Sequence, residues 1–347
     1  MRQRLAALAA AALLVGGCGF DKGTIEAGGR VNGPNLTIYS SLPAPGRGVS
    51  RDMVDAEKLA IAQAGGKAGD FGINFVSIGE GPPDRDAPAK AAGLAAAQVI
   101  RDPQVIAVIG TLRSNTALTA VPLFNAAGIL EVSPGAGYPG FDSPVAPGEP
   151  EHWFPSGRKT LARVVGNDED QAKVLLRSGR HVAVEAEAGR APEALANAIR
   201  DADTGSLVDD PKRADAIVYA GTDVASAVGV AESLAREDKH AKIVFPDELT
   251  RAGIAKRLPR PVRRRAVFAT SAPERDPAFE AAFQQRFGRA PDPYAVLAYT
   301  AMRRVLQAIA DAGPHARLRP VVAARYFALP PVTHRFRLIS SPASRRG

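Results

Sequence analysis

Short apolar runs alternate with longer segments of helical periodicity along most of the chain, beginning at Leu36. Continuous apolar runs of this kind are typical of strands that are buried on both faces of a parallel sheet. In the first half, the pattern predicts strands at 36–40, 73–78, 105–109 and 129–132, and helices that begin near Ser50, Pro88 and Ser114. Alternating strands and helices predict a doubly wound parallel sheet.

A second unit of the same kind follows a break in the pattern. Residues 141–155 contain four prolines and no periodic segment, so they are interpreted as the passage into a second lobe. Beyond them, helices are predicted at 168–177, 191–202, 224–236 and 250–257, and strands at 181–185, 206–208, 215–220, 242–245 and 266–270. Two helices, at 277–287 and 294–312, then return the chain to the first lobe, and a last strand is predicted at 333–338.

The expected fold class is therefore α/β, with two doubly wound parallel-sheet lobes. We expect the N-terminal lobe to comprise residues 36–150 and 275–313. The C-terminal lobe is expected to comprise residues 151–274 and 314–347.

The N-terminus indicates where the protein is expected to function. Arg2 and Arg4 precede an apolar stretch at 5–15, and small residues then lead to Cys18. The arrangement resembles a bacterial lipoprotein signal, which implies removal of residues 1–17 and lipidation of Cys18, with a plain secretory signal as the alternative. The apolar stretch is far shorter than the roughly 20 residues that a spanning helix needs. Residues 18–35 predict a flexible tether with a root-mean-square span of about 20 to 25 Å.

Cysteine content and charge exclude several classes of site. Cys18 is the only cysteine, so no disulfide, Cys-based zinc site or thiol redox pair is expected. The formal net charge is +8. Removal of the signal would lower it, because the charges of Arg2 and Arg4 are lost with residues 1–17. Arg260 and residues 263–265 form a dense basic cluster, interpreted as a solvated surface or as a contact for anionic lipid or wall polymer. No nucleic-acid partner is expected.

The segment 105–134 carries the clearest candidate chemistry. An apolar strand leads through Gly110 to Ser114, which is expected to cap the following helix. The free N–H groups of Asn115 and Thr116 should then point out of the carboxyl end of the strand, where anionic groups bind.

Enzymatic sites are not indicated. Residues 135–140 fit the pattern G-x-G-x-x-G, but Pro139 and the prolines after it deny the helix that should receive a pyrophosphate. The sequence has no G-x-S-x-G elbow and no Walker loop. Its five histidines are scattered without the spacing of metal ligands. We therefore expect no catalysis, no cofactor and no metal.

Several local sequences, in a characteristic order, resemble the type I periplasmic binding proteins. The subgroup indicated is the leucine/isoleucine/valine-binding family of ABC importers, over roughly 36–313. The sequences concerned are AVIG at 107–110, Ser114, GILEVSP at 128–134, residues 279–288 and APDPYAVLAY at 290–299. The resemblance implies two Rossmann-like lobes, joined by a multi-strand hinge, that close on a small ligand. It also implies that a membrane permease recognises the closed form.

The resemblance also implies particular ligand contacts. Ser114 matches a serine that grips the α-carboxylate of the ligand, and Gly135 and Gly137 lie in the second loop that does so, where Gly137 offers only its backbone. Asp247 or Glu248 falls where relatives hold the α-ammonium. Aromatic residues that cover the ligand in relatives are replaced by Ala188 with Gly189 and by Thr222 with Asp223, and Tyr138 is a candidate substitute.

Most of these residues have structural interpretations as well. Ser114 is a good helix cap whatever binds nearby, and carboxylates such as Asp247 and Glu248 favour the first turn of a helix. Thr222 and Asp223 are likewise placed to begin a helix.

The leading expectation is a monomeric, lipid-anchored, extracytoplasmic solute-binding protein. It would capture a small polar or anionic molecule, amino-acid-like or amide-like, and deliver it to an ABC permease. The alternative is a lipoprotein sensor or scaffold of the same fold that binds an envelope protein instead of a small ligand.

Overall fold

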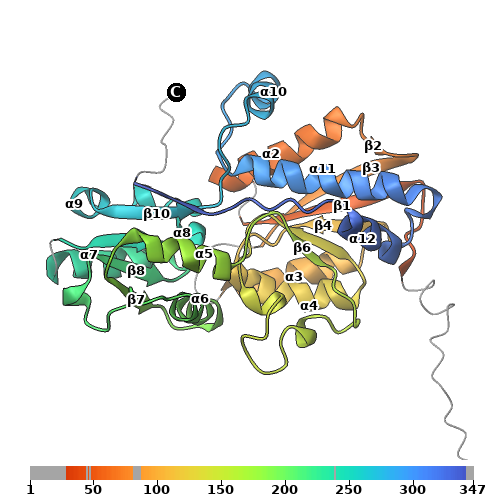
Figure 1. Cartoon of the computed structure of the whole chain (residues 1–347). Coiled ribbons are helices and arrows are strands. Elements are labelled where there is room, and N and C mark those ends of the chain that lie inside the picture. The colour runs from red at the N-terminus through yellow and green to blue at the C-terminus, as the bar shows by residue number, and fades with distance from the viewer. Residues whose placement is uncertain (1–28, 44–45, 47, 81–86, 238–239, 341–347) are drawn as a thin grey trace, which may run out of the picture.

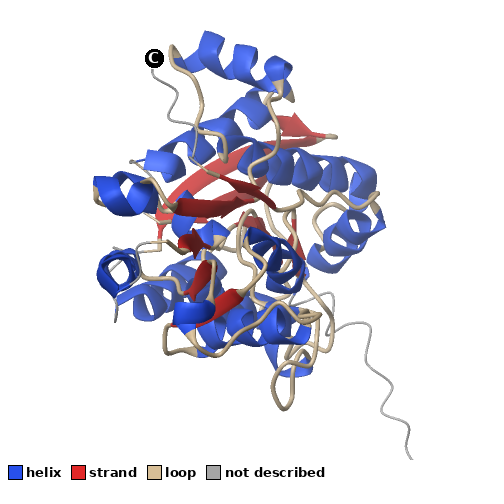
Figure 2. Cartoon of the chain, turned by 60° about the vertical axis from the view of Figure 1, so that its left-hand side comes forward, coloured by secondary structure: helices blue, strands red, loops and turns tan. Residues whose placement is uncertain are grey.

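The computed structural model describes residues 29–43, 46, 48–80, 87–237 and 240–340. These residues form two sheets with helices on both faces, and each sheet belongs to one lobe (Figures 1 and 2). The predicted signal and Cys18 lie outside the described residues, as does most of the tether. Among the described helices, none combines the length and apolar character needed to cross a membrane.

The first lobe contains a six-stranded sheet in the order β2-β3-β1-β4-β5-β6. All neighbouring strands are parallel except β2 and β3. The strands are β1 (Asn35–Leu42), β2 (Lys67–Ala68), β3 (Phe71–Gly79), β4 (Val105–Ile109), β5 (Leu130–Ser133) and β6 (Leu161–Arg163). Its helices are α2 (Gly48–Gln63), α3 (Ala87–Ile100), α4 (Ser114–Ala126), α10 (Pro277–Phe287), α11 (Ala295–Ala312) and α12 (Arg319–Ala328).

The second lobe contains a five-stranded sheet in the order β11-β10-β9-β8-β7, in which β11 is antiparallel to β10. The strands are β7 (Val182–Ala186), β8 (Ala216–Ala220), β9 (Lys242–Phe245), β10 (Ala266–Thr270) and β11 (Arg337–Ile339). Its helices are α5 (Asp168–Leu175), α6 (Arg190–Asp201), α7 (Val224–Glu237), α8 (Asp247–Arg251) and α9 (Arg260–Arg263). The predicted α/β fold of two doubly wound, mostly parallel lobes is confirmed.

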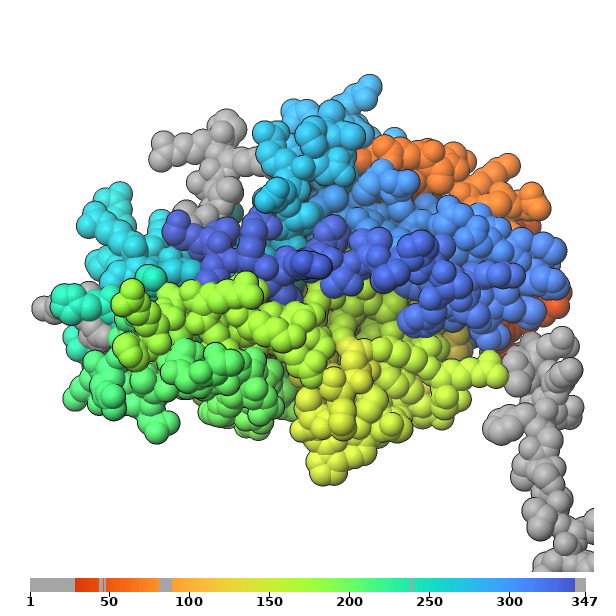
Figure 3. All heavy atoms as spheres, viewed as in Figure 1, coloured from red at the N-terminus to blue at the C-terminus, as the bar shows by residue number. Residues whose placement is uncertain are grey.

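The chain passes between the lobes three times. The passages follow β6, follow β10 and precede β11. The last of them, between α12 and β11, runs across both lobes in Figure 1 and lies at the surface on the face shown in Figure 3. These passages are the multi-strand hinge that the family resemblance implied.

Two segments lie in the first lobe although the sequence pattern assigned them to the second. Strand β6 pairs with β5, so the first sheet continues past residue 150. Helix α12 packs against α11 through Val322, Ala323 and Tyr326. A three-residue strand and a short apolar helix face are too brief to show a period in the sequence.

Two other predicted segments are shorter than expected. The strand at 206–208 is reduced to an isolated bridge between Val182 and Leu207. The helix at 250–257 is divided into α8 and a 3-10 turn at Ile254–Lys256, with Gly253 in a left-handed conformation between them. Helix α8 begins at Asp247, three residues earlier than predicted.

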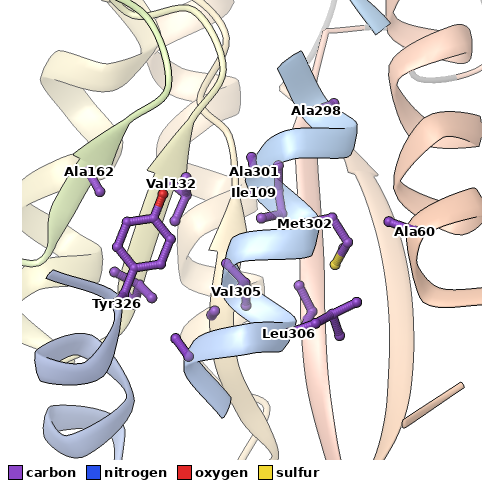
Figure 4. Packing of buried hydrophobic residues seen from close by; sticks show 14 of the residues in the cluster. Ala60, Ile109, Val132, Ala162, Ala298, Ala301, Met302, Val305, Leu306 and Tyr326 are labelled. Carbon is purple, nitrogen blue, oxygen red and sulfur yellow. The ribbon is translucent and has the colours of Figure 1, made fainter. Parts of the chain in front are cut away.

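The largest core cluster of the first lobe lies between its sheet and helices α2, α11 and α12. Met302 and Leu306 of α11 point towards Ala60 of α2, and the ring of Tyr326 lies beside Val132 and Ala162 (Figure 4). One face of α11 is buried along its length because its apolar residues form a stripe, and this stripe made the helix predictable from the sequence.

A polar anchor also attaches α12 to the sheet. Arg319, which is 7% exposed, donates from Nε to the carbonyl of Val105 at 2.9 Å and from Nη1 to that of Ala127 at 3.1 Å. We expect Arg319→Ala to lower the free energy of unfolding by about 2 to 3 kcal/mol, because both carbonyls lose a charged donor. Urea denaturation measures the loss. Arg325→Ala, at an exposed position of the same helix, should change little, and equal effects of the two substitutions would contradict the anchor.

Candidate functional site

Several of the predicted residues, Ser114, Gly135, Gly137, Asp247 and Glu248, lie where the carboxyl ends of β4 and β5 face α8 of the second lobe. Ser114 is the first residue of α4, and the cap position is taken by Arg113 without a side-chain cap bond. The expectation that Ser114 caps this helix was therefore wrong. Its hydroxyl instead accepts a hydrogen bond from the backbone N–H of Gly137, at 3.1 Å. Ser114 thus fixes the loop after β5 against the start of α4.

A carboxylate of the second lobe lies at the N-terminus of α4. The backbone N–H of Ser114 donates to Oε2 of Glu248 at 3.2 Å. Burial raises the pKa of Glu248, although Arg251 and Arg113 oppose the shift. A helix N-terminus stabilises negative charge, so this corner of the first lobe is a site for a carboxylate.

Asp247 is the centre of a buried hydrogen-bond network. Its Oδ1 accepts from the backbone N–H of Ser271 at 2.7 Å and from the hydroxyl of Tyr294 at 2.9 Å. Its Oδ2 accepts from Nη1 of Arg251 at 2.6 Å and from the hydroxyl of Ser271 at 3.0 Å. Tyr294 packs in the first-lobe core, so the network joins the two lobes.

Arg251 extends from the second lobe into the first. Its Nη2 donates to the carbonyl oxygens of Leu112 at 3.2 Å and Gly135 at 3.1 Å. The side chains of Arg251 and Asp247 are 2% and 4% exposed. A Cβ on Gly135 would lie only 2.7 Å from Cζ of Arg251, so this glycine leaves room for the guanidinium.

Gly137 leaves room for a second charged side chain. A Cβ on Gly137 would collide with the carboxylate of Asp168, whose backbone N–H donates to the Gly137 carbonyl at 2.8 Å. Nε2 of Gln171 donates to this carboxylate at 2.6 Å. Burial raises the pKa of Asp168 to about 7, and nearby Glu248 adds to the shift. Gly137 has no hydroxyl to offer a ligand, and the space of its missing side chain is occupied by the carboxylate of Asp168.

Three buried polar atoms in the same region, two donors and one acceptor, have no hydrogen-bond partner among the described residues. Nε and Nη2 of Arg113 are buried without a hydrogen-bond partner among the described residues, and so is Oε1 of Glu248. Burial raises the pKa of Glu80 to about 7, while Arg113 and Thr116 favour its charged form. Arg113 was missed by sequence reasoning. Its signal is a cation at the N-terminus of a helix, where anions are usual.

The remaining predicted residues serve local roles or lie at the rim. Nδ2 of Asn115 donates to the hydroxyl of Thr222 across the lobes at 2.9 Å, in an exposed position. Thr116 is fully buried and its hydroxyl donates to Glu80. Asp223 accepts from the N–H of Ser226 at 2.6 Å, as a helix-capping carboxylate does.

Tyr138 does not contact the Asp247 network. Its side chain is 1% exposed and packs edge-on against Phe141 and Trp153. Its hydroxyl donates to Oε1 of Glu149 at 2.6 Å. This aromatic cluster also contains Ala191 and Ala194 of α6, so it joins the lobes outside the predicted site. The expectation that Tyr138 forms a wall of the ligand site finds no support in this placement.

Two surface cavities lie away from the site. A cavity of about 520 Å³ is lined by residues around α10, and another of about 340 Å³ lies between β6 and α12. Neither is lined by a predicted ligand-binding residue. Within the described part of the chain, no cluster of His, Cys, Asp or Glu is arranged to hold a metal ion.

Comparison with known proteins identifies the fold. No family model matches the sequence, and no curated protein does. A leucine-binding protein of Thermotoga maritima is similar in structure, with 19% identity and a TM-score of 0.66 over 84% of this chain and 87% of that one. An ABC transporter substrate-binding protein of Desulfitobacterium hafniense, in complex with Leu, has 15% identity and a TM-score of 0.66 over 84% and 88%.

A solute-binding protein of R. palustris, in complex with benzoate, gives 17% identity and a TM-score of 0.63 over 85% of this chain and 86% of that one. At these identities the likeness concerns the fold of the matched part of the chain rather than individual residues. The chain has the type I periplasmic binding protein fold, the fold of these ABC transporter substrate-binding proteins.

Proposed function

We propose that the chain is an extracytoplasmic, monomeric binding protein, anchored by lipid on Cys18, that captures a small polar or anionic solute and delivers it to an ABC permease. The observation that supports the proposal most directly is the polar corner at the start of α4. There the N–H of Ser114 already donates a hydrogen bond to the carboxylate of Glu248. Two buried donors of Arg113 have no partner among the described residues. Two proteins of this fold have been solved in complex with leucine and with benzoate.

The chemistry of this corner indicates the class of solute. Buried donors without partners weaken a structure, so a ligand that supplies acceptors to Arg113 gains those hydrogen bonds. Oε1 of Glu248 offers an acceptor nearby for an amide or ammonium group. A small carboxylate or amide is therefore the expected ligand, and aromatic groups have no stacking partner at 188–189 or 222–223.

A thermal-shift screen tests the proposal. The protein beginning at residue 19 would be screened against amino acids, amides, ureas and aromatic acids. A ligand at 100 times its dissociation constant should stabilise the folded state by about 2.7 kcal/mol. The absence of a shift with every class would count against solute capture.

Arg113→Met provides the residue-level test for any ligand that the screen finds. We expect at least a tenfold loss of affinity, because a hydrogen bond to a charged group contributes about 1.5 to 3 kcal/mol. Isothermal titration calorimetry measures the affinity, and Arg101→Met, at an exposed position in the same lobe, serves as the control. Unchanged affinity of Arg113→Met would place the ligand elsewhere.

One observation favours a second function, that of a sensor or scaffold which binds an envelope protein. The N–H of Ser114 and the carboxylate of Asp247 are hydrogen-bonded to the chain's own Glu248 and Arg251. A solute would have to replace these partners. If the protein is a sensor or scaffold, no solute shifts the melting temperature. Cross-linking of the full-length protein in its native membrane should then capture a partner other than a permease.

The lipid anchor is tested separately by mass spectrometry of the mature protein. An N-terminal Cys18 that carries diacylglycerol is the expected result. Cys18→Ala should abolish the diacylglycerol modification, because the lipid is carried on the sulfur of Cys18. A mature N-terminus other than Cys18 would support the plain secretory signal.

A further inference from the structure

We infer that the lobes of this protein close without a solute, because Arg251 and Glu248 occupy the space between them as an internal ligand. Both residues belong to α8 of the second lobe, one helical turn apart, and both bond to the first lobe. Together they present a carboxylate and a guanidinium to the same edge of the first sheet. The inference goes beyond the proposed function, since closure of this kind holds whether or not a solute also binds.

The guanidinium of Arg251 is held from three directions. Nη1 donates to Asp247 in the second lobe, and Nη2 donates to two carbonyls of the first lobe, those of Leu112 and Gly135. The ring of Tyr294, from the first lobe, lies 5.8 Å from the guanidinium carbon, within the range of a cation–π contact. A buried charge with this many partners is a built site for a guanidinium.

The backbone of the first lobe is shaped for this side chain. At Gly135 a side chain would approach both Cζ and Nη1 of Arg251 to within 2.7 Å. Any larger residue at this position would therefore compete with the guanidinium for the same space. The pairing of Gly135 with Arg251 joins residues that are 116 positions apart in the chain.

Contacts nearer the surface support the closed arrangement. Arg190 of α6 donates to Oε1 of Glu149 at 3.1 Å and lies 5.6 Å above the ring of Trp153. Ala191 and Ala194 of the same helix belong to the cluster that includes Ala117 and Val121 of α4. The lobes thus meet through apolar surface as well as through charges.

Distance measurement tests closure in the unmodified site. The protein beginning at residue 19 contains no cysteine, so two cysteines can be introduced at Leu94 of α3 and Arg200 of α6 and spin-labelled. Without any solute we expect a single narrow distance distribution that agrees with the closed structure. A broad or longer distribution would overturn the inference. Failure of solute binding would leave this result unchanged, so the two proposals are tested independently.

Arg251→Ala with added guanidinium tests the internal ligand itself. The variant should show a longer distance component, which guanidinium at about 10 mM removes, whereas ammonium at the same concentration does not. This concentration is far below the molar range in which guanidinium denatures proteins. Arg257→Ala, an exposed arginine close to α8, should keep the closed distribution. A closed distribution in Arg251→Ala, or equal effects of both cations, would overturn the inference.

Discussion

Replacement of Asp247 by alanine should lower the free energy of unfolding by about 3 to 5 kcal/mol, the largest loss expected for one side chain of this site. The reason is the guanidinium of Arg251, which stays buried but loses its counterion. The hydroxyls of Ser271 and Tyr294 lose their acceptor in the same substitution. A buried charge that loses its hydrogen-bonded counterion costs far more than an exposed pair contributes.

Urea denaturation at constant pH measures this loss, and two further variants identify its cause. The double variant Asp247→Leu with Arg251→Met should be more stable than Asp247→Ala, because neither charge is then left unpaired. Asp209→Ala, at an exposed position of the same lobe, should change stability by less than about 0.5 kcal/mol. A loss below about 1 kcal/mol for Asp247→Ala would show that water reaches Arg251 and that the lobes are open in solution.

The sequence predicted most of the fold because the central strands of both sheets are buried on both faces. The run at Val105–Ile109 is fully buried, and such runs are recognisable without knowledge of their neighbours. Helix α12 escaped prediction for the opposite reason. Its docking depends on Arg319, which donates to the carbonyls of Val105 and Ala127. These residues lie 214 and 192 positions away in the sequence. A polar anchor of this kind leaves no period in the sequence.

Only some of the predicted site residues contact one another in the structure. Ser114 follows β4 of the first sheet and Glu248 follows β9 of the second, and the two are joined by a hydrogen bond between the lobes. That these residues contact a ligand stays a prediction. Arg251 could be found only from the relative placement of the two lobes, which local periodicity does not contain. The need for glycine at position 135 could not be predicted from the sequence either. It arises because the guanidinium of Arg251 fills the space that a side chain would take.

The second large effect that we expect is a dependence of the free energy of unfolding on pH, caused by Glu131. It lies on β5 with 1% exposure, and its Oε1 accepts from the N–H of Thr111 at 2.7 Å and from the hydroxyl of Thr111 at 3.2 Å. Its Oε2 is buried and has no hydrogen-bond partner among the described residues. Burial raises the pKa of Glu131 to about 8, against a usual value of 4.5. The folded chain therefore holds a proton that the unfolded chain releases at a lower pH.

This difference determines the sign of the pH dependence. Between the two pKa values the folded state binds more protons than the unfolded state, so the contribution of Glu131 to stability falls as the pH rises through this range. Glu131→Gln keeps an acceptor for Thr111 and does not titrate, so its stability should fall less between pH 5 and pH 9 than that of the wild type. The expected difference is a few kcal/mol, at about 1.4 kcal/mol per pKa unit. Denaturation midpoints at several pH values measure it, with Glu151→Gln as an exposed control. Parallel profiles for Glu131→Gln and the wild type would mean that the carboxyl is ionised in the folded chain, with a compensating charge or water beside Oε2.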